Sequence, residues 1–565
     1  MPPRFPRRSR RLLLVLAVVA ALVAGVSVVA ATRSSGPAPV AERNLMIPVP
    51  SAPGAKTTIT LDATIYTPAV TPAPAVLLAH GFGGTKDSVA AQARTLAGDG
   101  FVVLAWSARG FGRSAGEIGI NAPDGEVADA RALVDYLATQ KQVRLDAPGD
   151  PRVGVAGGSY GGALALSLAG TDPRIDADAA AITWNDLGQA LLPDQAGPTA
   201  PAARTPAAGT TGADGVLKRS WAGIFFAAGA SPTGVCGRFT PAVCQGYLAA
   251  SVSGAPTPAL LALLKAHSPV ATNAGIKAPT LLLQGEADTL FGLDQADANA
   301  REIAKAGAPV RVSWFSGGHD AGGTNADADA QVADFLRFHL LGQGTDPGTG
   351  FRYEVAGSVS TRGTVRTRAV EAPRYPGLAG DPTPTTDLAL TGGPQTIARP
   401  PGASPSAIST VPGIGAALGG LASSALTGLA TFDVPGQVAR FSTAPLAERL
   451  TVTGASRVAL TVRAVGGGAA GAPAVLFAKL YDVSPDGTRT LPGGGVSAFR
   501  VPVGDQTTVQ VTLPGIVHPV EAGHTLQLAV TTTDQAYAVP LTPAAYQVGL
   551  AGATLALPLV GGNDV

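Results

Sequence analysis

Short, mostly apolar runs recur between residues 75 and 314, and stretches with the apolar spacing of a helix separate them. The runs are Ala75–Ala79, Phe101–Ala105, Val153–Ala156, Thr280–Leu283 and Val310–Trp314. The helical stretches are 88–96, 126–138 and 327–340. Apolar runs of this length that alternate with helices are typical of a parallel sheet covered on both faces. The pattern predicts a doubly wound α/β domain over residues 56–345.

One long stretch interrupts this alternation. From Trp184 to Ile276 the chain is rich in Pro, Ala and Gly, with one good helical segment at 258–267. A loop of that length inside a compact domain is unusual unless it has a function. We therefore expect residues 184–276 to form a cap inserted over the active site of the α/β domain.

Beyond residue 345, Gly and Pro become frequent and short segments alternate polar with apolar residues. The clearest of these segments are 364–370, 449–453, 458–462, 508–513 and 526–531. Such alternation, with few helical signals, is typical of antiparallel sheets. It predicts a connecting region of strands and loops over 346–430 and a β-sandwich over 431–565.

The N-terminal segment is expected to direct export. Five arginines in the first 11 residues precede an uncharged apolar run of 20 residues from Leu12 to Ala31. A basic segment followed by an apolar one is typical of a signal peptide, and this run is also long enough to span a bilayer. Residues 1–31 are therefore a signal peptide or an N-terminal membrane anchor, followed by a linker at 32–55. Either alternative places the protein outside the cytoplasm, secreted or anchored.

Composition narrows the range of partners. Only 14% of the 565 residues are charged, the net charge is +1, and no basic stripe lies beyond the N-terminal segment, which argues against nucleic-acid binding. Cys236 and Cys244 are close in sequence and, in an exported chain, predict a local disulfide. Two cysteines and six histidines in all argue against a metal site, and no cofactor is expected. Membrane contact is expected only through the N-terminal segment, and the oligomeric state stays open.

The clearest chemical motif is the segment Gly157–Gly162, which reads GGSYGG. It lies between an apolar run and the helical stretch that begins at Ala163. A sharp strand-to-helix turn with glycines on both sides of a serine is a nucleophile elbow, which exposes the hydroxyl at a helix N-terminus. The motif predicts Ser159 as a nucleophile, and the alternative is a glycine-rich turn with an idle serine.

The segment 80–84, HGFGG, follows the first apolar run, where an elbow of this kind needs a partner loop. The backbone of such a loop can present an N–H group to the carbonyl of a bound substrate. We predict an oxyanion hole formed by the N–H groups of Phe82 and Tyr160, with His80 in a structural role.

Asp288 and His319 each follow an apolar run, at the strand edge where open α/β sheets place their sites. The order serine, aspartate, histidine is that of α/β-hydrolases. His319 is predicted to be the general base and Asp288 the acid that orients it. Glu286 and Asp294 are nearby alternatives for the acid. Three residues in or beside the cap are candidates for the substrate pocket: Trp184, Asp186 and Trp221.

These motifs resemble those of the X-Pro dipeptidyl-peptidase and cocaine-esterase group of α/β-hydrolases. The elbow looks like the group's G-x-S-Y-x-G, and residues 109–114 and 125–140 resemble its characteristic loop and helix. Three C-terminal segments resemble the group's non-catalytic jelly-roll domain: 441–446, 481–487 and 521–526. The resemblance covers most of the chain from about residue 55 and implies a jelly roll for the C-terminal sandwich. Family esterases can use a tyrosine hydroxyl in the oxyanion loop, and with Phe82 here two backbone donors are expected.

The leading hypothesis is an exported serine hydrolase that cleaves acyl esters, or peptides with a penultimate proline, through an acyl-enzyme. Its substrate is then a small ester or a short peptide. Two alternatives stay open from the sequence. One is an acyltransferase that uses the same triad on cell-envelope sugars or lipids, and the other is a non-catalytic module that binds the envelope.

Overall fold

The computed structural model describes residues 40–197, 215–230, 234–321, 323–359, 365–378, 385–403, 407–409, 432–466, 473–503 and 506–559. The predicted signal peptide or anchor at 1–31 lies outside these ranges. Among the helices within them, none is both long and apolar enough to cross a membrane.

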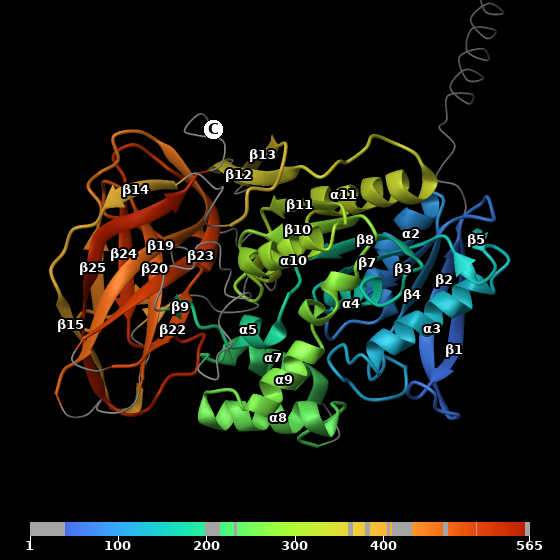
Figure 1. Ribbon diagram of the computed structural model, residues 1–565, viewed down its shortest axis with the longest axis horizontal. Helices are drawn as coiled ribbons and strands as arrows, with labels where there is room; N and C mark the ends of the chain where they lie inside the picture. The colour runs from blue at the N-terminus through green and yellow to red at the C-terminus, as the bar shows by residue number, and fades with distance from the viewer. Residues whose placement is uncertain are drawn as a thin grey trace, which may run out of the picture.

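A ten-stranded mixed sheet forms the centre of the N-terminal domain (Figure 1), in the order β1-β2-β4-β3-β7-β8-β10-β11-β12-β13. Neighbours from β4 to β12 are parallel, whereas β1, β2 and β13 pair antiparallel at the edges. The strands are β1 (Ala41–Pro50), β2 (Thr58–Thr67), β3 (Ala75–Ala79), β4 (Val102–Trp106), β7 (Val153–Gly158), β8 (Ile175–Ala181), β10 (Thr280–Gly285), β11 (Val310–Phe315), β12 (Phe351–Val359) and β13 (Val365–Ala372). The predicted α/β class is confirmed.

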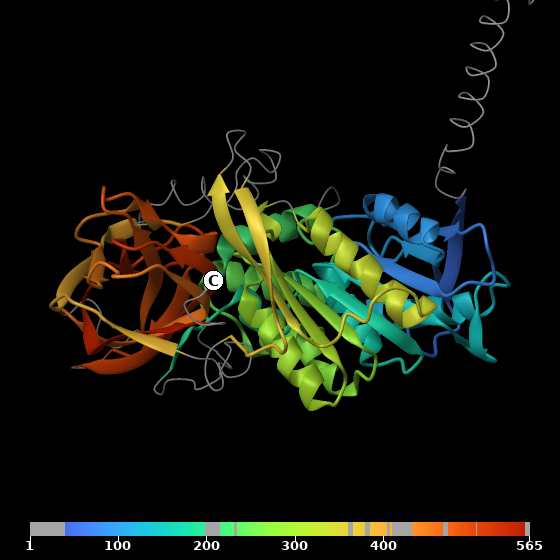
Figure 2. The same cartoon turned by 90° about the horizontal axis from the view of Figure 1, so that it is seen from above.

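Helices cover both faces of this sheet, as Figures 1 and 2 show. One face packs against α3 (Glu126–Ala138), α4 (Tyr160–Ala169) and α10 (Leu293–Lys305). The other face packs against α2 (Ala90–Gly98) and α11 (Ala326–Leu336). The central strands are buried on both sides, which is why their sequences are continuous apolar runs.

The sheet extends further at both ends than the sequence indicates. Residues 41–50, predicted to belong to a linker, form β1, and the pair β12–β13 lies beyond the predicted domain end at 345. In β1 only Ile47 and Val49 are buried, because an edge strand contacts the core along one short stretch. Edge strands of this kind lack the apolar run that marks the central ones.

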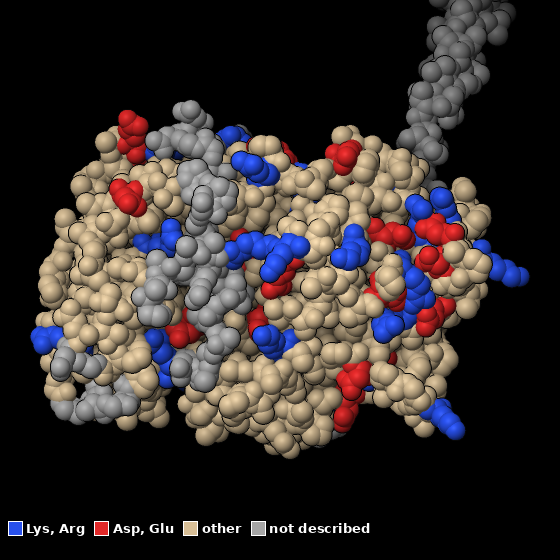
Figure 3. Space-filling view, viewed as in Figure 1, with Lys and Arg blue, Asp and Glu red and all other residues tan. Residues whose placement is uncertain are grey.

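Residues between β8 and β10 form a group of helices at the carboxyl edge of the sheet (Figure 1). They are α5 (Leu187–Leu191), α7 (Arg219–Ala230), α8 (Pro241–Ser253) and α9 (Pro258–Ala266). We call this group the cap. The face of the molecule in Figure 3 carries few charged side chains over the cap. A short strand of the cap, β9 (Ala196–Gly197), pairs antiparallel with β23 (Thr507–Val520) of the C-terminal domain.

The C-terminal domain is a sandwich of two antiparallel sheets beside the α/β domain (Figure 2), as predicted. One sheet contains β14 (Thr385–Ala389), β15 (Gln395–Arg399), β19 (Leu450–Ala464), β23 and β25 (Ala544–Pro558). The other contains β18 (Val438–Ser442), β20 (Ala474–Val483), β21 (Arg489–Thr490), β22 (Ser497–Val501) and β24 (Thr525–Thr531). The predicted segments 449–453 and 458–462 belong to one long strand, β19, with an irregularity in its pairing between Ala455 and Arg457.

Asp178, in β8, is a carboxyl group within the core of the α/β domain. It is fully buried, and neither oxygen has a hydrogen-bond partner among the described residues. Burial raises the pKa of Asp178 well above its usual value. The folded protein therefore keeps a proton on this group at pH values where the unfolded chain has lost it.

Because of that extra proton, we expect the free energy of unfolding of the wild type to fall relative to Asp178→Asn as the pH rises above about 4. The expected slope is about 1.4 kcal/mol for each pH unit, until the folded carboxyl ionises. Urea unfolding of both proteins between pH 4 and 8 measures the difference. Asp124→Asn, at an exposed position, is the control. Parallel stability curves for wild type and Asp178→Asn would contradict the prediction.

Candidate active site

The nucleophile elbow forms between β7 and α4. Ser159 adopts a φ of 56° and a ψ of −118°, a backbone conformation that is rare for a residue with a side chain. Its N–H donates to the carbonyl of Ala181 at 2.8 Å. A Cβ atom on Gly157 would lie 2.5 Å from the backbone of Gly161, and one on Gly161 would lie 2.4 Å from the carbonyl oxygen of Ala79. The glycines thus allow close backbone packing, while the unusual dihedral angles belong to the serine itself.

The residues predicted as base and acid meet Ser159 at the carboxyl edge of the sheet. His319 begins a 3₁₀ turn after β11, and its Nε2 lies 2.8 Å from Ser159 Oγ. Its Nδ1 lies 2.7 Å from Asp288 Oδ2. Because a carboxylate can only accept, Nδ1 carries the proton and Nε2 is free to accept from the serine hydroxyl.

Asp288 is held by four donors and its side chain is fully buried. Besides His319 Nδ1, the backbone N–H of His319 donates to Oδ2 at 3.2 Å. The N–H groups of Leu290 and Phe291 donate to Oδ1 at 3.1 and 2.9 Å. These hydrogen bonds from N–H groups fix the orientation of the carboxylate.

The loop that carries His319 passes very close to the loop that carries Asp288. Gly318 has a φ of 127°, and a Cβ atom there would lie 2.7 Å from Asp288 Cβ. Any other residue at position 318 would push the two loops apart. The close contact between the two loops therefore requires glycine at position 318, directly before His319.

The two alternative acids lie apart from His319. Glu286 is half-buried beside β12, where it accepts from the N–H of Glu354 at 3.1 Å, and desolvation raises its pKa well above the usual value. Asp294 lies at the start of α10 and accepts from the side chain of Gln295 at 2.8 Å. Among the described residues, no group of three His, Cys, Asp or Glu side chains is placed to hold a metal ion.

One predicted oxyanion donor, Tyr160, lies in the elbow, and the other, Phe82, lies in the loop after β3. Tyr160 is the first residue of α4, where a backbone N–H has no acceptor within its own helix. None of the hydrogen bonds among the described residues uses the N–H of Phe82. The aromatic rings of the two residues contact each other edge to face, with centroids 5.5 Å apart.

His80 fixes the oxyanion loop rather than taking part in the triad. Its Nε2 accepts from the N–H of Ala108 at 2.9 Å, so that its Nδ1 donates to the carbonyl of Gly81 at 2.8 Å. Burial lowers the pKa of His80, which keeps the imidazole neutral in this role. Arg109, which follows Ala108, forms two hydrogen bonds of 2.7 Å with Asp129 and ties the neighbouring loop to α3.

The side chain of Tyr160 points into the protein and away from this chemistry. Its hydroxyl donates to Glu126 at 3.0 Å, and Glu126 also accepts from the N–H groups of Gly119 and Ala122. Burial raises the pKa of Tyr160 well above its usual value. The phenol therefore anchors the start of α4, and only the backbone of Tyr160 is directed to Ser159.

A cavity of about 530 Å³ opens above the nucleophile. Its described lining is mostly apolar, and Asp329 is the one carboxylate in it. Asp329 is exposed and accepts from Thr324 Oγ1 at 2.9 Å. Its walls include Phe82, Ser159, Ile182, Phe225 and His319. Phe225, on α7, was not predicted; it contacts the rings of Phe82 and Trp221 at 5.5 and 5.9 Å.

Only one of the three predicted pocket residues contacts the triad. The ring of Trp221 lies edge to face against His319, with centroids 6.0 Å apart. Trp184 is buried and packs against Phe291, with centroids 5.1 Å apart. Asp186 is the N-cap of α5, where it accepts from the N–H groups of Gly188 and Gln189. None of the three residues lines the cavity above Ser159, and Trp221 lines a smaller neighbouring cavity.

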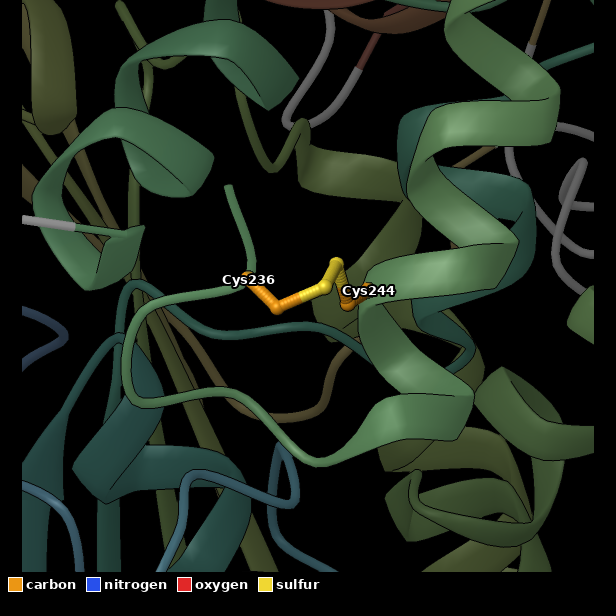
Figure 4. The surroundings of a disulfide bond; sticks show 2 residues. All are labelled: Cys236 and Cys244. Carbon is orange, nitrogen blue, oxygen red and sulfur yellow. A yellow bond between two sulfur atoms is a disulfide. The ribbon is translucent and has the colours of Figure 1, made fainter. Parts of the chain in front are cut away.

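The predicted disulfide joins Cys236 and Cys244 within the cap (Figure 4), with Cα atoms 5.4 Å apart. The loop that it closes carries Phe239, whose ring stacks on Phe226 at 5.2 Å and on Phe82 at 6.0 Å. The disulfide thus closes the loop whose Phe239 packs against Phe82.

Comparison with known proteins agrees with this geometry. The family described as X-Pro dipeptidyl-peptidase (S15 family) matches residues 57–304, and its C-terminal non-catalytic domain matches residues 420–554. No curated protein sequence matches the chain.

Several solved structures share the fold over nearly the whole chain. An alpha-amino acid ester hydrolase has a TM-score of 0.63 and 15% identity, covering 94% of this chain and 98% of its own. An aminopeptidase from a marine sediment Thaumarchaeota archaeon has a TM-score of 0.62 and 14% identity, with the same coverage. A CocE/NonD family hydrolase from Staphylococcus aureus has a TM-score of 0.60 and 12% identity, covering 92% of this chain and 94% of its own.

The two family matches, together with the shared fold, confirm the predicted resemblance. The two matches together place the chain in the X-Pro dipeptidyl-peptidase (S15) family, with its C-terminal non-catalytic domain, and the chain is a serine hydrolase of the peptidase or esterase class.

Proposed function

We propose that this protein hydrolyses small acyl esters through an acyl-enzyme on Ser159, with His319 as general base and Asp288 as the orienting acid. The observation that carries the proposal is the hydrogen-bonded series Asp288–His319–Ser159, with distances of 2.7 and 2.8 Å. Peptides with a penultimate proline are the second class of substrate that the family suggests.

The chemistry follows from these contacts. His319 Nε2 takes the proton of Ser159 as its Oγ attacks the acyl carbonyl, and the imidazolium is stabilised by Asp288. The N–H groups of Phe82 and Tyr160 stabilise the developing oxyanion. His319 then protonates the leaving alcohol, and in the second half of the cycle it activates the water that releases the acid.

The lining of the cavity favours esters over peptides with a free amino terminus. Such a peptide carries an ammonium group, which needs a buried or well-placed carboxylate. Among the described lining residues the one carboxylate, Asp329, is exposed and is already bonded to Thr324. An uncharged ester with an apolar acyl group suits walls that include Phe82 and Phe225.

We also propose that the protein acts outside the cytoplasm. The basic and apolar segment 1–31 supports export. The Cys236–Cys244 disulfide is consistent with an oxidising environment.

Covalent labelling tests the proposed reaction. We expect a fluorophosphonate probe to label the purified protein at one site per chain, and peptide mass mapping to place the adduct on Ser159. Short-chain p-nitrophenyl esters should be turned over at least about tenfold faster, in kcat/KM, than Ala-Pro-p-nitroanilide. Absence of labelling would contradict the triad, and a preference for the anilide would replace ester by peptide hydrolysis.

A further inference from the structure

Lys218 lies in the cap, immediately before α7, and its partly buried side chain reaches the loop that carries the proposed acid. Its Nζ donates to the carbonyl of Thr289 at 2.9 Å and to that of Leu290 at 2.8 Å. These carbonyls belong to the two residues that directly follow Asp288. A lysine ammonium with two backbone acceptors is a strong tie between two segments distant in sequence.

Three polar atoms of Thr289 are held by residues from other segments. Its carbonyl accepts from Lys218, its Oγ1 accepts from Trp221 Nε1 at 3.1 Å, and its N–H donates to Asp320 at 2.7 Å. Lys218 and Trp221 are three residues apart at the start of α7, so they hold the loop from the cap. The N–H groups of the next residues, Leu290 and Phe291, are those that bond Asp288 Oδ1.

Lys218 does not line the cavity above Ser159. It lines a second, smaller cavity of about 60 Å³, where the cap, the α/β domain and the C-terminal sandwich meet. This cavity includes Asp288, but neither Ser159 nor His319. Lys218 is thus placed to act on the acid without contacting a substrate bound above the serine.

We propose that Lys218 is a positioning residue for the reaction: it holds the 289–290 carbonyls so that the following N–H groups stay on Asp288, and it places a positive charge beside that carboxylate. This inference rests on the proposed triad. It makes the cap part of the catalytic apparatus, in addition to its place as a wall of the cavity. Without the ammonium, the loop has two unsatisfied carbonyls and the carboxylate loses a countercharge.

The groups that face Lys218 determine what its charge can do. Asp294, Asp288 and Asp320 carry the acidic charges that act on it, and Tyr537 of the sandwich lines the same cavity. Burial lowers the pKa of Lys218, while the three carboxylates oppose that shift and favour the ammonium. Burial raises the pKa of Asp294 and of Asp320, whereas Asp288 accepts from four N–H groups.

Lys218→Met tests the proposal, because it keeps the aliphatic stem and removes the charge and its donors. Fluorophosphonate titration first gives the number of active sites in each preparation. We expect kcat per titrated site to fall by about 10- to 100-fold, with KM changed by less than about threefold. The acid limb of the kcat/KM profile should move to higher pH by roughly 0.5 to 1 unit, because loss of a nearby positive charge favours the protonated base.

Two further variants separate positioning from general stability. The adjacent cavity has room for the larger side chain of Lys218→Arg. This variant should recover most of kcat and return the acid limb of the kcat/KM profile to its wild-type position. Arg219→Met, which removes a charge from the next and exposed residue, should match the wild type. If Lys218→Met does not fold, Lys218→Gln gives the same comparison.

An unchanged kcat per titrated site together with an unchanged acid limb would overturn the proposal. A rise in KM alone would also overturn it and would make Lys218 a substrate contact. A wild type that is not labelled on Ser159 would instead refute the triad, so the two failures are distinguishable.

Discussion

Ser159→Ala is expected to lower kcat on p-nitrophenyl esters by about 10⁶-fold, the loss typical of a serine hydrolase without its nucleophile. The oxyanion donors and the cavity remain in the variant, so we expect a small residual rate above that of the uncatalysed hydrolysis in water. The loss should appear in kcat, because substrate still binds in the same cavity. Steady-state kinetics at enzyme concentrations high enough to detect the residual rate measure it.

The variant should retain its fold. Alanine keeps the Cβ atom and the backbone N–H that bonds the carbonyl of Ala181, and the glycines that allow close packing of the turn are unchanged. Its melting temperature should lie within a few degrees of the wild type. Ser167→Ala, in the same helix, is the matched control and should keep full activity. Comparable ester turnover in wild type and Ser159→Ala would show that another residue is the nucleophile.

The central residues of this site could be predicted because each follows a strand that the sequence marks clearly. Ser159, Asp288 and His319 come after β7, β10 and β11, whose interiors are buried on both faces and therefore read as apolar runs. Parallel strands bring their carboxyl ends to one edge, so residues far apart in sequence meet there. The choice of Asp288 over Glu286 needed only its distance from the strand end.

Other parts of the site have no comparable local signal. Lys218 immediately precedes α7 and Phe225 lies in the middle of it, and the contacts of both depend on how the cap packs over the loops of the sheet. An aromatic residue in an amphipathic helix is most often core, and a lysine before a helix is most often solvated. Asp186 did carry a signal: an Asp directly before an apolar helical turn is a typical N-cap.

At the edges of the sheet, β1 was missed, and the predicted strand 364–370, which forms β13, was assigned to the connecting region. Both strands are largely exposed, so they lack the apolar run that marks a strand of the central α/β sheet. The pairing of β9 with β23 lay equally beyond prediction, because a strand of two residues is defined only by its partner. Long-range packing, and no property of the segment itself, determines such elements.

Asp288→Asn is expected to lower kcat by about 10⁴-fold. The carboxylate accepts four N–H groups, two on each oxygen. An asparagine has only one accepting oxygen, so one pair of donors must face its NH₂ group. If the NH₂ group faces His319, it donates to Nδ1 and forces the proton onto Nε2, where it blocks the acceptor that Ser159 needs. If it faces Leu290 and Phe291, it opposes two N–H groups and displaces the loop.

The two rival acids provide matched controls for this prediction. Glu286→Gln keeps an acceptor for the N–H of Glu354 and replaces a carboxyl whose pKa burial has raised. Asp294→Asn can keep its bond with Gln295. Both variants should retain kcat within about threefold of the wild type when rates are divided by the number of fluorophosphonate-titrated sites. Because neither residue contacts His319, a loss of about 10⁴-fold in either of them, or its absence in Asp288→Asn, would move the role of orienting acid away from Asp288.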